Sequence, residues 1–256
     1  MKKEKKIKIY IAIHKKCKLP NNDIYYPLQM GAGIKGRKDL CFEKDSTGDN
    51  ISIKNPNYCE LTGLYWMWKN SKCDIIGLVH YRRYFFDKIY YHKYENILKK
   101  DKINDYLKDY DFIVSKKVRI PFYTVEKQYD VMHHIEDYEM CRNILNEKYP
   151  DYVQSFDKIS KRRYLYAFNM FISNKSLFDN YCKWLFDVLF ELEKRVDISN
   201  YSDYDKRIFG FLSERLFNVW LDKNNYKLKE LYVYNIEENW LKQLIINIIK
   251  KIFIRG

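Results

Sequence analysis

The feature that most constrains this chain is an apolar run, Ile75–Val79, that stops abruptly at a cluster of polar side chains. The run has the length of a buried strand and contains one glycine. Such runs are typical of central strands in parallel sheets, which are buried on both faces. The polar cluster that follows consists of His80, Tyr81, Arg82, Arg83 and Tyr84. We therefore expect a strand that delivers two guanidinium groups, an imidazole and two phenols to one edge of a sheet.

The end of such a strand is a favourable position for a ligand. In open α/β sheets, ligands bind just beyond the carboxyl ends of the strands. The planar guanidinium group of arginine matches phosphate oxygens with parallel hydrogen bonds. We therefore predict that Arg82 and Arg83 bind an anionic group, with the alternative that both side chains only solvate a loop.

Composition limits both the fold and the class of partner. The 256 residues suffice for one large domain or two small ones, and 46% of them are hydrophobic. The low counts of glycine (8) and proline (5) argue against a turn-dense all-β sandwich. The formal charge of +13 suits nucleic acid, a phosphate-bearing substrate or an acidic membrane. Because lysine is abundant throughout the chain, the charge alone does not choose among these partners.

The cysteines and the N-terminus predict a cytoplasmic protein. None of the six cysteines belongs to a CxxC pair or has metal-ligand spacing, so we interpret them as reduced side chains. No long apolar stretch follows the basic residues at the N-terminus, and no run reaches the roughly 18 apolar residues of a membrane span.

Apolar periodicity predicts alternating strands and helices, and hence an α/β fold. Strands are expected at 6–13, 75–79, 111–115 and 166–173, and helices at 58–70, 90–110, 125–149, 176–195 and 204–221. Asn57 is expected to cap the first helix, with Glu60 as its partner. Within the segment 236–256, residues 240–255 place apolar side chains on one half of a helical projection and basic ones on the other. This pattern predicts a basic amphipathic C-terminal helix that contacts an anionic membrane surface or packs on protein.

Several polar residues stand inside apolar patterns and are candidates for chemistry. His133 and Asp137 are four residues apart and would share a helix face, as a structural pair or as a pair that moves a proton. Asn169 interrupts an apolar run and must find hydrogen-bond partners, either in the protein or in a ligand. Glu214 lies within an apolar helical pattern, which indicates a paired or functional carboxylate.

Five segments together resemble a known family. In chain order they are Asp49–Ser52 (DNIS), Asn55–Asn70 (NPNYCELTGLYWMWKN), Gly77–Phe85 (GLVHYRRYF), Asn169–Ile172 (NMFI) and Gly210–Leu216 (GFLSERL). This combination resembles the bacterial family catalogued as domain of unknown function 4422, whose members lie among capsular and exopolysaccharide synthesis proteins. The resemblance covers residues 6–235, nearly the whole chain. It therefore implies a single domain over 1–235, followed by the amphipathic segment 236–256.

The resemblance implies a fold, an activity and a set of partners. The fold would be a GT-A-like, Rossmann-type mixed sheet flanked by helices. The activity would be transfer of a sugar, most simply galactose in pyranose or furanose form, from a UDP-sugar donor. The acceptor would be a growing polysaccharide or an undecaprenyl-linked oligosaccharide, which places the protein at the inner face of the cell membrane.

Enzymes of the GT-A type commonly hold a divalent metal through an Asp-x-Asp motif after a central strand. Here that position is Val79–Arg82, which contains no acid. Asp109-Tyr-Asp111 and Asp203-Tyr-Asp205 match by letters but fall before a strand and at the start of a helix. We therefore expect Arg82 and Arg83, with His80, to neutralise the leaving diphosphate without a metal cofactor. The alternative is Mn²⁺ or Mg²⁺ bound through His80 and a distant carboxylate.

The resemblance also suggests which residues meet the donor and the acceptor. The nucleotide is expected over the end of the first strand and the glycine-rich stretch, near Ala12, His14, Pro27, Gln29 and Gly31. Further donor contacts are expected from Asp49, Asn50, Ser52, His80, Tyr81, Arg82, Arg83 and Asn169. Tyr65 or Trp66 would stack on uracil only if it did not pack in the core. The general base for an inverting transfer remains open among Asp137, Asp205 and Glu214, with His133 as an accessory.

Two other classes of function compete with an enzyme. A nucleic-acid-binding protein would fit the charge, but no recognition motif appears, so we expect no nucleic-acid partner. A non-catalytic adaptor at the membrane surface would fit the amphipathic tail. The adaptor predicts that the tail is essential and that Arg82 and Arg83 are not.

Overall fold

The computed structural model describes residues 4–88 and 93–237. The main sheet comprises β1 (Ile7–Ile13), β2 (Tyr25–Gln29), β3 (Glu43–Lys44), β4 (Ile75–His80), β5 (Arg83–Phe86), β6 (Phe112–Ser115), β9 (Phe171–Asn174) and β10 (Leu228–Asn235). A small second sheet joins β7 (Val118–Arg119) to β8 (Tyr164–Leu165). The helices are α1 (Asn55–Tyr58), α2 (Leu61–Asn70), α3 (Lys100–Asp109), α4 (Val125–Met132), α5 (Ile135–Lys148), α6 (Val153–Ser160), α7 (Lys175–Arg195) and α8 (Ile208–Lys223). The expected α/β architecture is confirmed.

The main sheet mixes parallel and antiparallel strands. Strand β1 lies between β2 and β4 and is parallel to both. Strand β4 forks: Ile75–Leu78 pair antiparallel with β9, whereas His80 at its end pairs with Arg83 of β5. The sheet therefore opens at the polar end of β4, where the sequence predicted a ligand.

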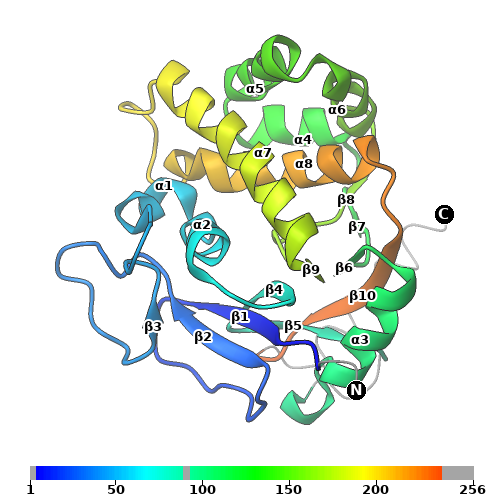
Figure 1. The fold of residues 1–256 in the computed structure, drawn as a ribbon. Helices are drawn as coiled ribbons and strands as arrows, with labels where there is room; N and C mark the ends of the chain where they lie inside the picture. The colour runs from blue at the N-terminus through cyan, green and yellow to red at the C-terminus, as the bar shows by residue number, and fades with distance from the viewer. Residues whose placement is uncertain (1–3, 89–92, 238–256) are drawn as a thin grey trace.

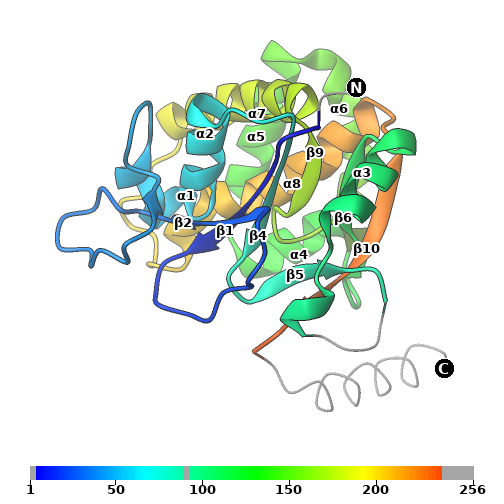
Figure 2. The same cartoon turned by 60° about the horizontal axis from the view of Figure 1, so that its bottom comes forward.

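Helices and loops cover the sheet on both faces (Figures 1 and 2). Along β1, Ile9 and Ile11 belong to one apolar core, whereas Tyr10 and Ala12 belong to the other, as the two-residue period of a strand requires. The larger core joins the sheet to α2 and to α5–α8. The smaller core includes α3 and the region after β5.

Gly77 allows β9 to approach β4 closely. A Cβ atom at this position would lie 2.6 Å from the Cγ1 atom of Ile172 and 3.0 Å from the carbonyl oxygen of Phe171. The glycine that interrupts the apolar run thus marks a close contact between strands.

Some predicted elements differ from the structure in their boundaries. The helix expected at 58–70 is broken at Cys59, whose φ is +52°, so Asn57 lies inside α1 and does not cap α2. The helix expected at 125–149 is two helices, because the chain is extended at His133 and His134. The strand expected at 166–173 begins only at Phe171. The helix expected at 90–110 is confirmed only over α3.

The predicted C-terminal amphipathic helix lies outside the described residues, apart from its first two positions. Within 4–88 and 93–237, the helices are too short or too polar for any of them to cross a membrane.

Candidate active site

A cleft of about 440 Å³ opens at the carboxyl ends of β1 and β4. Four arginines line it: Arg37, Arg82, Arg83 and Arg207. Two histidines, His14 and His80, and two carboxylic acids, Glu60 and Glu214, complete the ionisable groups of its lining. The cleft therefore combines an excess of positive charge with two acids, a combination suited to an anionic ligand and to proton transfer.

The β4–β5 hairpin supplies two of these guanidinium groups. Ala12 lies opposite His80 in the β1–β4 register, so the first strand ends at the base of the hairpin. The guanidinium carbon of Arg83 lies 4.8 Å from the ring centroid of Phe168, and that of Arg82 lies 5.6 Å from the ring of Tyr81. Such contacts with aromatic faces position a guanidinium group in the cleft.

His80 is held in its neutral form. Its Nε2 atom lies 2.8 Å from the carbonyl oxygen of Phe168, and because a carbonyl only accepts, Nε2 carries the proton. Nδ1 is then an acceptor. Burial, with smaller contributions from Arg83 and Arg82, lowers the pKa of His80 against the opposing effect of Glu60. Burial likewise lowers the pKa of His14 at the rim, together with nearby cations.

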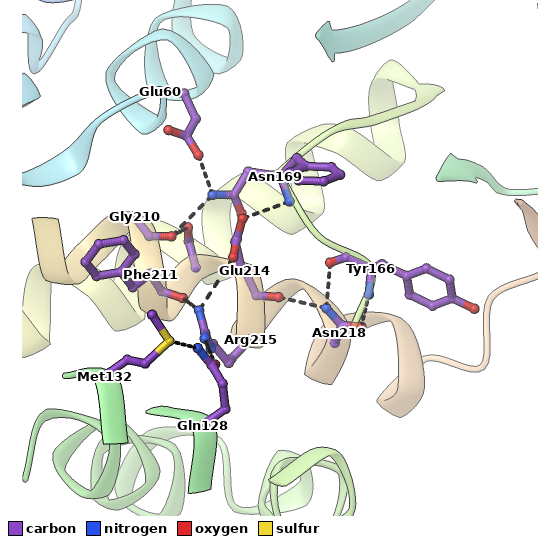
Figure 3. A network of polar contacts seen from close by, with 12 residues as sticks. Glu60, Gln128, Met132, Tyr166, Asn169, Gly210, Phe211, Glu214, Arg215 and Asn218 are labelled. Atoms are coloured by element: carbon purple, nitrogen blue, oxygen red, sulfur yellow. Dashed lines mark hydrogen bonds and ion pairs between the residues drawn. The ribbon is translucent and has the colours of Figure 1, made fainter. Parts of the chain in front are cut away.

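A left-handed link before β9 organises the acids of the cleft. Phe168 and Asn169 have φ angles of +78° and +50°, a region that bulky residues rarely adopt. The Nδ2 of Asn169 donates to Glu60 Oε1 at 2.7 Å and to the carbonyl of Gly210 at 3.3 Å, while the Phe168 N–H donates to Glu214 Oε1 at 2.8 Å. Figure 3 shows both carboxylates directed at this link. The strained backbone thus fixes two acids and one histidine at once.

Glu214 lies in α8, and a quarter of its side chain is exposed. Burial raises the pKa of Glu214, and Glu60 adds to this effect, whereas the cation of Arg215 opposes it. Arg215 Nη1 lies 3.5 Å from Glu214 Oε2 and 2.8 Å from the carbonyl of Phe211, and its Nη2 donates to Gln128 at 2.5 Å (Figure 3). A carboxylate with a raised pKa, fixed by hydrogen bonds in a cleft, is suited to act as a base.

The residues of the cleft do not fit a divalent metal ion of the Asp-x-Asp type. The end of β4 presents arginines in place of acids. Asp111 of the first letter match accepts the N–H of Lys227, and Asp205 of the second accepts the hydroxyl of Ser202. Among the residues that the structure describes, no group of three or more His, Cys, Asp or Glu side chains could hold a metal.

Residues 8–225 match the family model described as "Domain of unknown function (DUF4422)". The chain belongs to this family. The family resemblance inferred from the five sequence segments is therefore confirmed. All residues that line the cleft lie within the matched range of this DUF4422 protein.

A solved structure is also similar to this DUF4422 protein. It is the apo structure of WbbM, a bifunctional glycosyltransferase, with a TM-score of 0.85 and 31% sequence identity. The match covers 91% of this chain and 46% of the WbbM chain, so this protein spans about half the length of that relative. Among curated proteins, no match was found.

The structure brings part of the predicted site together. Seven of the residues predicted from the sequence line the cleft: Ala12, His14, His80, Tyr81, Arg82, Arg83 and Glu214. Asn169 lies behind the lining, only 3% exposed, where it holds Glu60. The sequence left two roles open for Asn169: hydrogen bonding within the protein or contact with a ligand. Its hydrogen bonds to Glu60 and Gly210 support the first role.

Other predicted donor contacts lie outside the lining of the cleft and stabilise a loop around Asp45. This buried carboxylate accepts hydrogen bonds from the N–H groups of Gly31 and Ala32 and from the hydroxyls of Ser52 and Thr62. Gly31 and Ser52 therefore bind the carboxylate of Asp45. The sequence did not single out Asp45 for this role.

The remaining predicted donor contacts have similar structural roles. Gln29 is buried and binds the carbonyl of Lys38 and the N–H of Leu40. Asp49 accepts a hydrogen bond from the hydroxyl of Tyr65. The side-chain amide of Asn50 donates to the carbonyl oxygens of Ser46 and Gly48 in the preceding turn. Tyr65 and Trp66 pack in the core and are therefore not available to stack on uracil.

The other catalytic candidates form a separate cluster. Because α4 ends before His133, this residue does not share a helix face with Asp137; its Nδ1 lies 3.7 Å from Asp205. Asp137 accepts the hydroxyl of Tyr201, and burial raises its pKa to about 6. The predicted pairing of His133 with Asp137 is therefore wrong. None of the three residues His133, Asp137 and Asp205 lines the cleft.

Sequence reasoning missed eight lining residues, among them Arg37, Glu60, Phe168 and Arg207. Glu60 lies in the NPNYCELTG segment, whose local pattern indicated only a helix-capping role for it. Arg207 enters the cleft from the turn before α8, where its Nε atom lies 3.2 Å from the Sγ of Cys59. No local pattern marks that arrangement.

Proposed function

We propose that this protein is a glycosyltransferase that uses a nucleotide-diphosphate sugar, most simply UDP-galactose in pyranose or furanose form. The acceptor would be a capsular or exopolysaccharide chain or an undecaprenyl-linked oligosaccharide at the inner membrane face. The observation that carries the proposal is the cleft in which four arginines face two fixed carboxylates. Similarity to a glycosyltransferase over 91% of the chain supports the same activity.

In this proposal the arginines stabilise the leaving group, which is the nucleotide diphosphate. When the bond between the sugar anomeric carbon and the diphosphate breaks, negative charge grows on the phosphate oxygens. Arg82 and Arg83, fixed on a two-residue hairpin, are preorganised cations of the kind that stabilises such charge. In this proposal the reaction requires no metal cofactor, and dependence on Mn²⁺ or Mg²⁺ is the alternative.

Glu214 takes the part of the general base. For a direct displacement, the acceptor hydroxyl loses its proton to Glu214 while its oxygen bonds to the anomeric carbon and UDP leaves. The raised pKa of Glu214 makes it a stronger base than an exposed glutamate. Neutral His80, through Nδ1, is an acceptor for a hydroxyl of either substrate.

Calorimetric titration of the protein with UDP in the presence of EDTA tests the proposal. Binding is expected without added metal. Arg82→Ala and Arg83→Ala are each expected to weaken it by about 1.5–3 kcal/mol, because each removes charged hydrogen bonds. Arg119→Ala, which removes an exposed arginine outside the lining, is the matched control and should bind UDP normally.

Two results would contradict parts of this proposal. Unchanged affinity in both cleft variants would remove the diphosphate role of the hairpin. Binding only after manganese is added would restore the metal-dependent alternative, and absence of binding in both conditions would favour the non-catalytic adaptor.

A further inference from the structure

Exposed apolar side chains gather in one segment of this protein. Within the described residues, seven large hydrophobic side chains are exposed, and five of them are Val118, Phe122, Tyr123, Val131 and Met132. Phe122 is the most exposed of all, at 87%. Single exposed hydrophobic residues are ordinary, but a concentration of them marks an interaction site.

The basic-aromatic loop, residues 116–123, is held in a defined shape. Its β7 strand pairs with β8, and Ile120 donates to the carbonyl of Arg163 at 2.8 Å. The side chain of Arg163 in turn donates to the carbonyl of Phe122 at 2.7 Å. Tyr123 donates to the carbonyl of Pro121 at 2.9 Å, which closes a tight turn around Phe122. The backbone therefore presents the Phe122 ring outward.

This outward presentation has a conformational cost. Phe122 has a φ of +67°, a left-handed conformation that is rare for a bulky side chain. Because the ring is exposed to solvent, burial of Phe122 in the described structure does not offset this cost.

The surroundings of the loop are basic. Residues 116–127 contain four cations (Lys116, Lys117, Arg119, Lys127) and one acid (Glu126), so 4 − 1 gives a local charge of +3. Two of these cations are paired with acids outside the segment: Lys117 lies 3.4 Å from Glu230, and Lys127 lies 2.6 Å from Asp130. Lys117 also lines a second pocket of about 230 Å³, with Lys158 and Arg162. Those two cations share one carboxylate, Asp222, at 2.8 and 2.6 Å. Basic residues thus precede and follow the exposed aromatic rings in the chain.

We propose that the basic-aromatic loop is the surface by which this protein binds an anionic lipid bilayer. Phe122 and Tyr123 enter the boundary between headgroups and acyl chains, where aromatic side chains are favoured. The lysines bind lipid phosphates, and the pocket beside Lys117 receives a headgroup. The charge favours a bilayer over a protein partner, because the core of a protein interface is depleted of lysine.

The position of the loop has a consequence for the cleft, and this part rests on the proposed function. Helix α4, which follows the loop, is tied by Gln128 to Arg215, the neighbour of Glu214. Strand β8, which pairs with the loop, is followed three residues later by Phe168 of the cleft lining. A bilayer on the loop would therefore hold the cleft close to a lipid-linked acceptor.

Co-sedimentation of the full-length protein with vesicles tests the proposal. One set of vesicles contains equal parts phosphatidylglycerol and phosphatidylcholine, and the other contains phosphatidylcholine alone. We expect binding to the anionic vesicles that weakens with added salt. The double variant Phe122→Asn/Tyr123→Ser should bind at least about tenfold more weakly, because it loses the two aromatic groups that would be buried in the bilayer. Asn is chosen because it tolerates the left-handed conformation at position 122.

The matched control is Ile53→Ser, which removes a hydrophobic side chain that is 70% exposed but lies outside the loop. It should bind vesicles as the wild type does. Equal binding by the double variant and the wild type, or equal binding to both kinds of vesicle, would overturn the proposal. A wild-type protein that does not sediment with anionic vesicles would also overturn it and leave the surface to a protein partner.

Calorimetry with UDP separates this proposal from the proposed function. The double variant should bind UDP with wild-type affinity, which also shows that it is folded. Failure of the wild type to bind UDP would contradict the proposed enzyme but not the membrane surface. Loss of UDP binding in the double variant alone would show a folding defect, and Tyr123→Ser by itself, expected to weaken vesicle binding severalfold, would then decide the matter.

Discussion

At the scale of single residues, Glu214 and His80 derive their properties from burial. Both lie beside the left-handed link at Phe168, which supplies an N–H to the carboxylate and a carbonyl to the imidazole. Burial favours the neutral form of each group, so it raises the pKa of Glu214 and lowers that of His80. The site thus holds a strong carboxylate base beside an uncharged histidine.

Glu214→Gln should lower kcat by about 10²–10⁴-fold and leave UDP affinity unchanged, because the amide cannot take a proton. In the wild type, the rate should fall as the pH is lowered through the pKa of Glu214. This fall should occur above the pH typical of an ordinary glutamate, since the pKa is raised. Initial rates and calorimetry on purified protein measure both quantities.

Asp205→Asn is the control for this prediction, because Asp205 is a carboxylate outside the cleft lining that the sequence had offered as a base. It should retain the wild-type rate. A fully active Glu214→Gln would instead assign the proton transfer to Glu60, the other acid of the cleft.

At the scale of elements, the fork in β4 depends on Gly77. Gly77→Ala should lower the free energy of unfolding by about 1–3 kcal/mol, because the added methyl overlaps Ile172 and the backbone of Phe171. Denaturant unfolding measures the change. The double variant Gly77→Ala/Ile172→Ala should lose less unfolding free energy than the sum of the losses in the two single variants. The reason is that Ile172→Ala removes the Cγ1 atom that the new methyl group at position 77 would overlap. Strict additivity would show that the close approach of the strands does not limit this position.

At the scale of the whole molecule, stability depends on pH through Asp137. Burial raises its pKa from 3.8 to about 6, so the folded state binds this proton more tightly than the unfolded state. Stability from this group is therefore present below about pH 4 and is lost as the pH rises towards 6.

Asp137→Asn should accordingly stabilise the protein at pH 7 by about 1–3 kcal/mol, because the amide keeps the oxygen that accepts the Tyr201 hydroxyl without the buried charge. Urea unfolding at pH 7 and at about pH 4 measures the effect. A larger stabilisation in acid than at neutral pH would contradict this assignment, and loss of activity would return Asp137 to the list of catalytic candidates.

The sequence by itself determined the features that depend on neighbouring residues. The apolar runs of β1 and β4, the periodicity of α7 and α8, and the placement of Arg82 and Arg83 after a buried strand all follow from local patterns. The five family segments, read in order, also sufficed to identify the DUF4422 family.

Only the tertiary structure decided which distant residues meet. Glu60, Asn169 and Glu214 converge because the left-handed link before β9 passes between α2 and α8, and backbone strain of this kind leaves no periodic trace in a sequence. The hydrogen bonds that draw Gly31 and Ser52 to Asp45 are likewise contacts between separate segments. Local propensity fixes the elements, but the direction of a polar side chain depends on the partner that the fold brings to it.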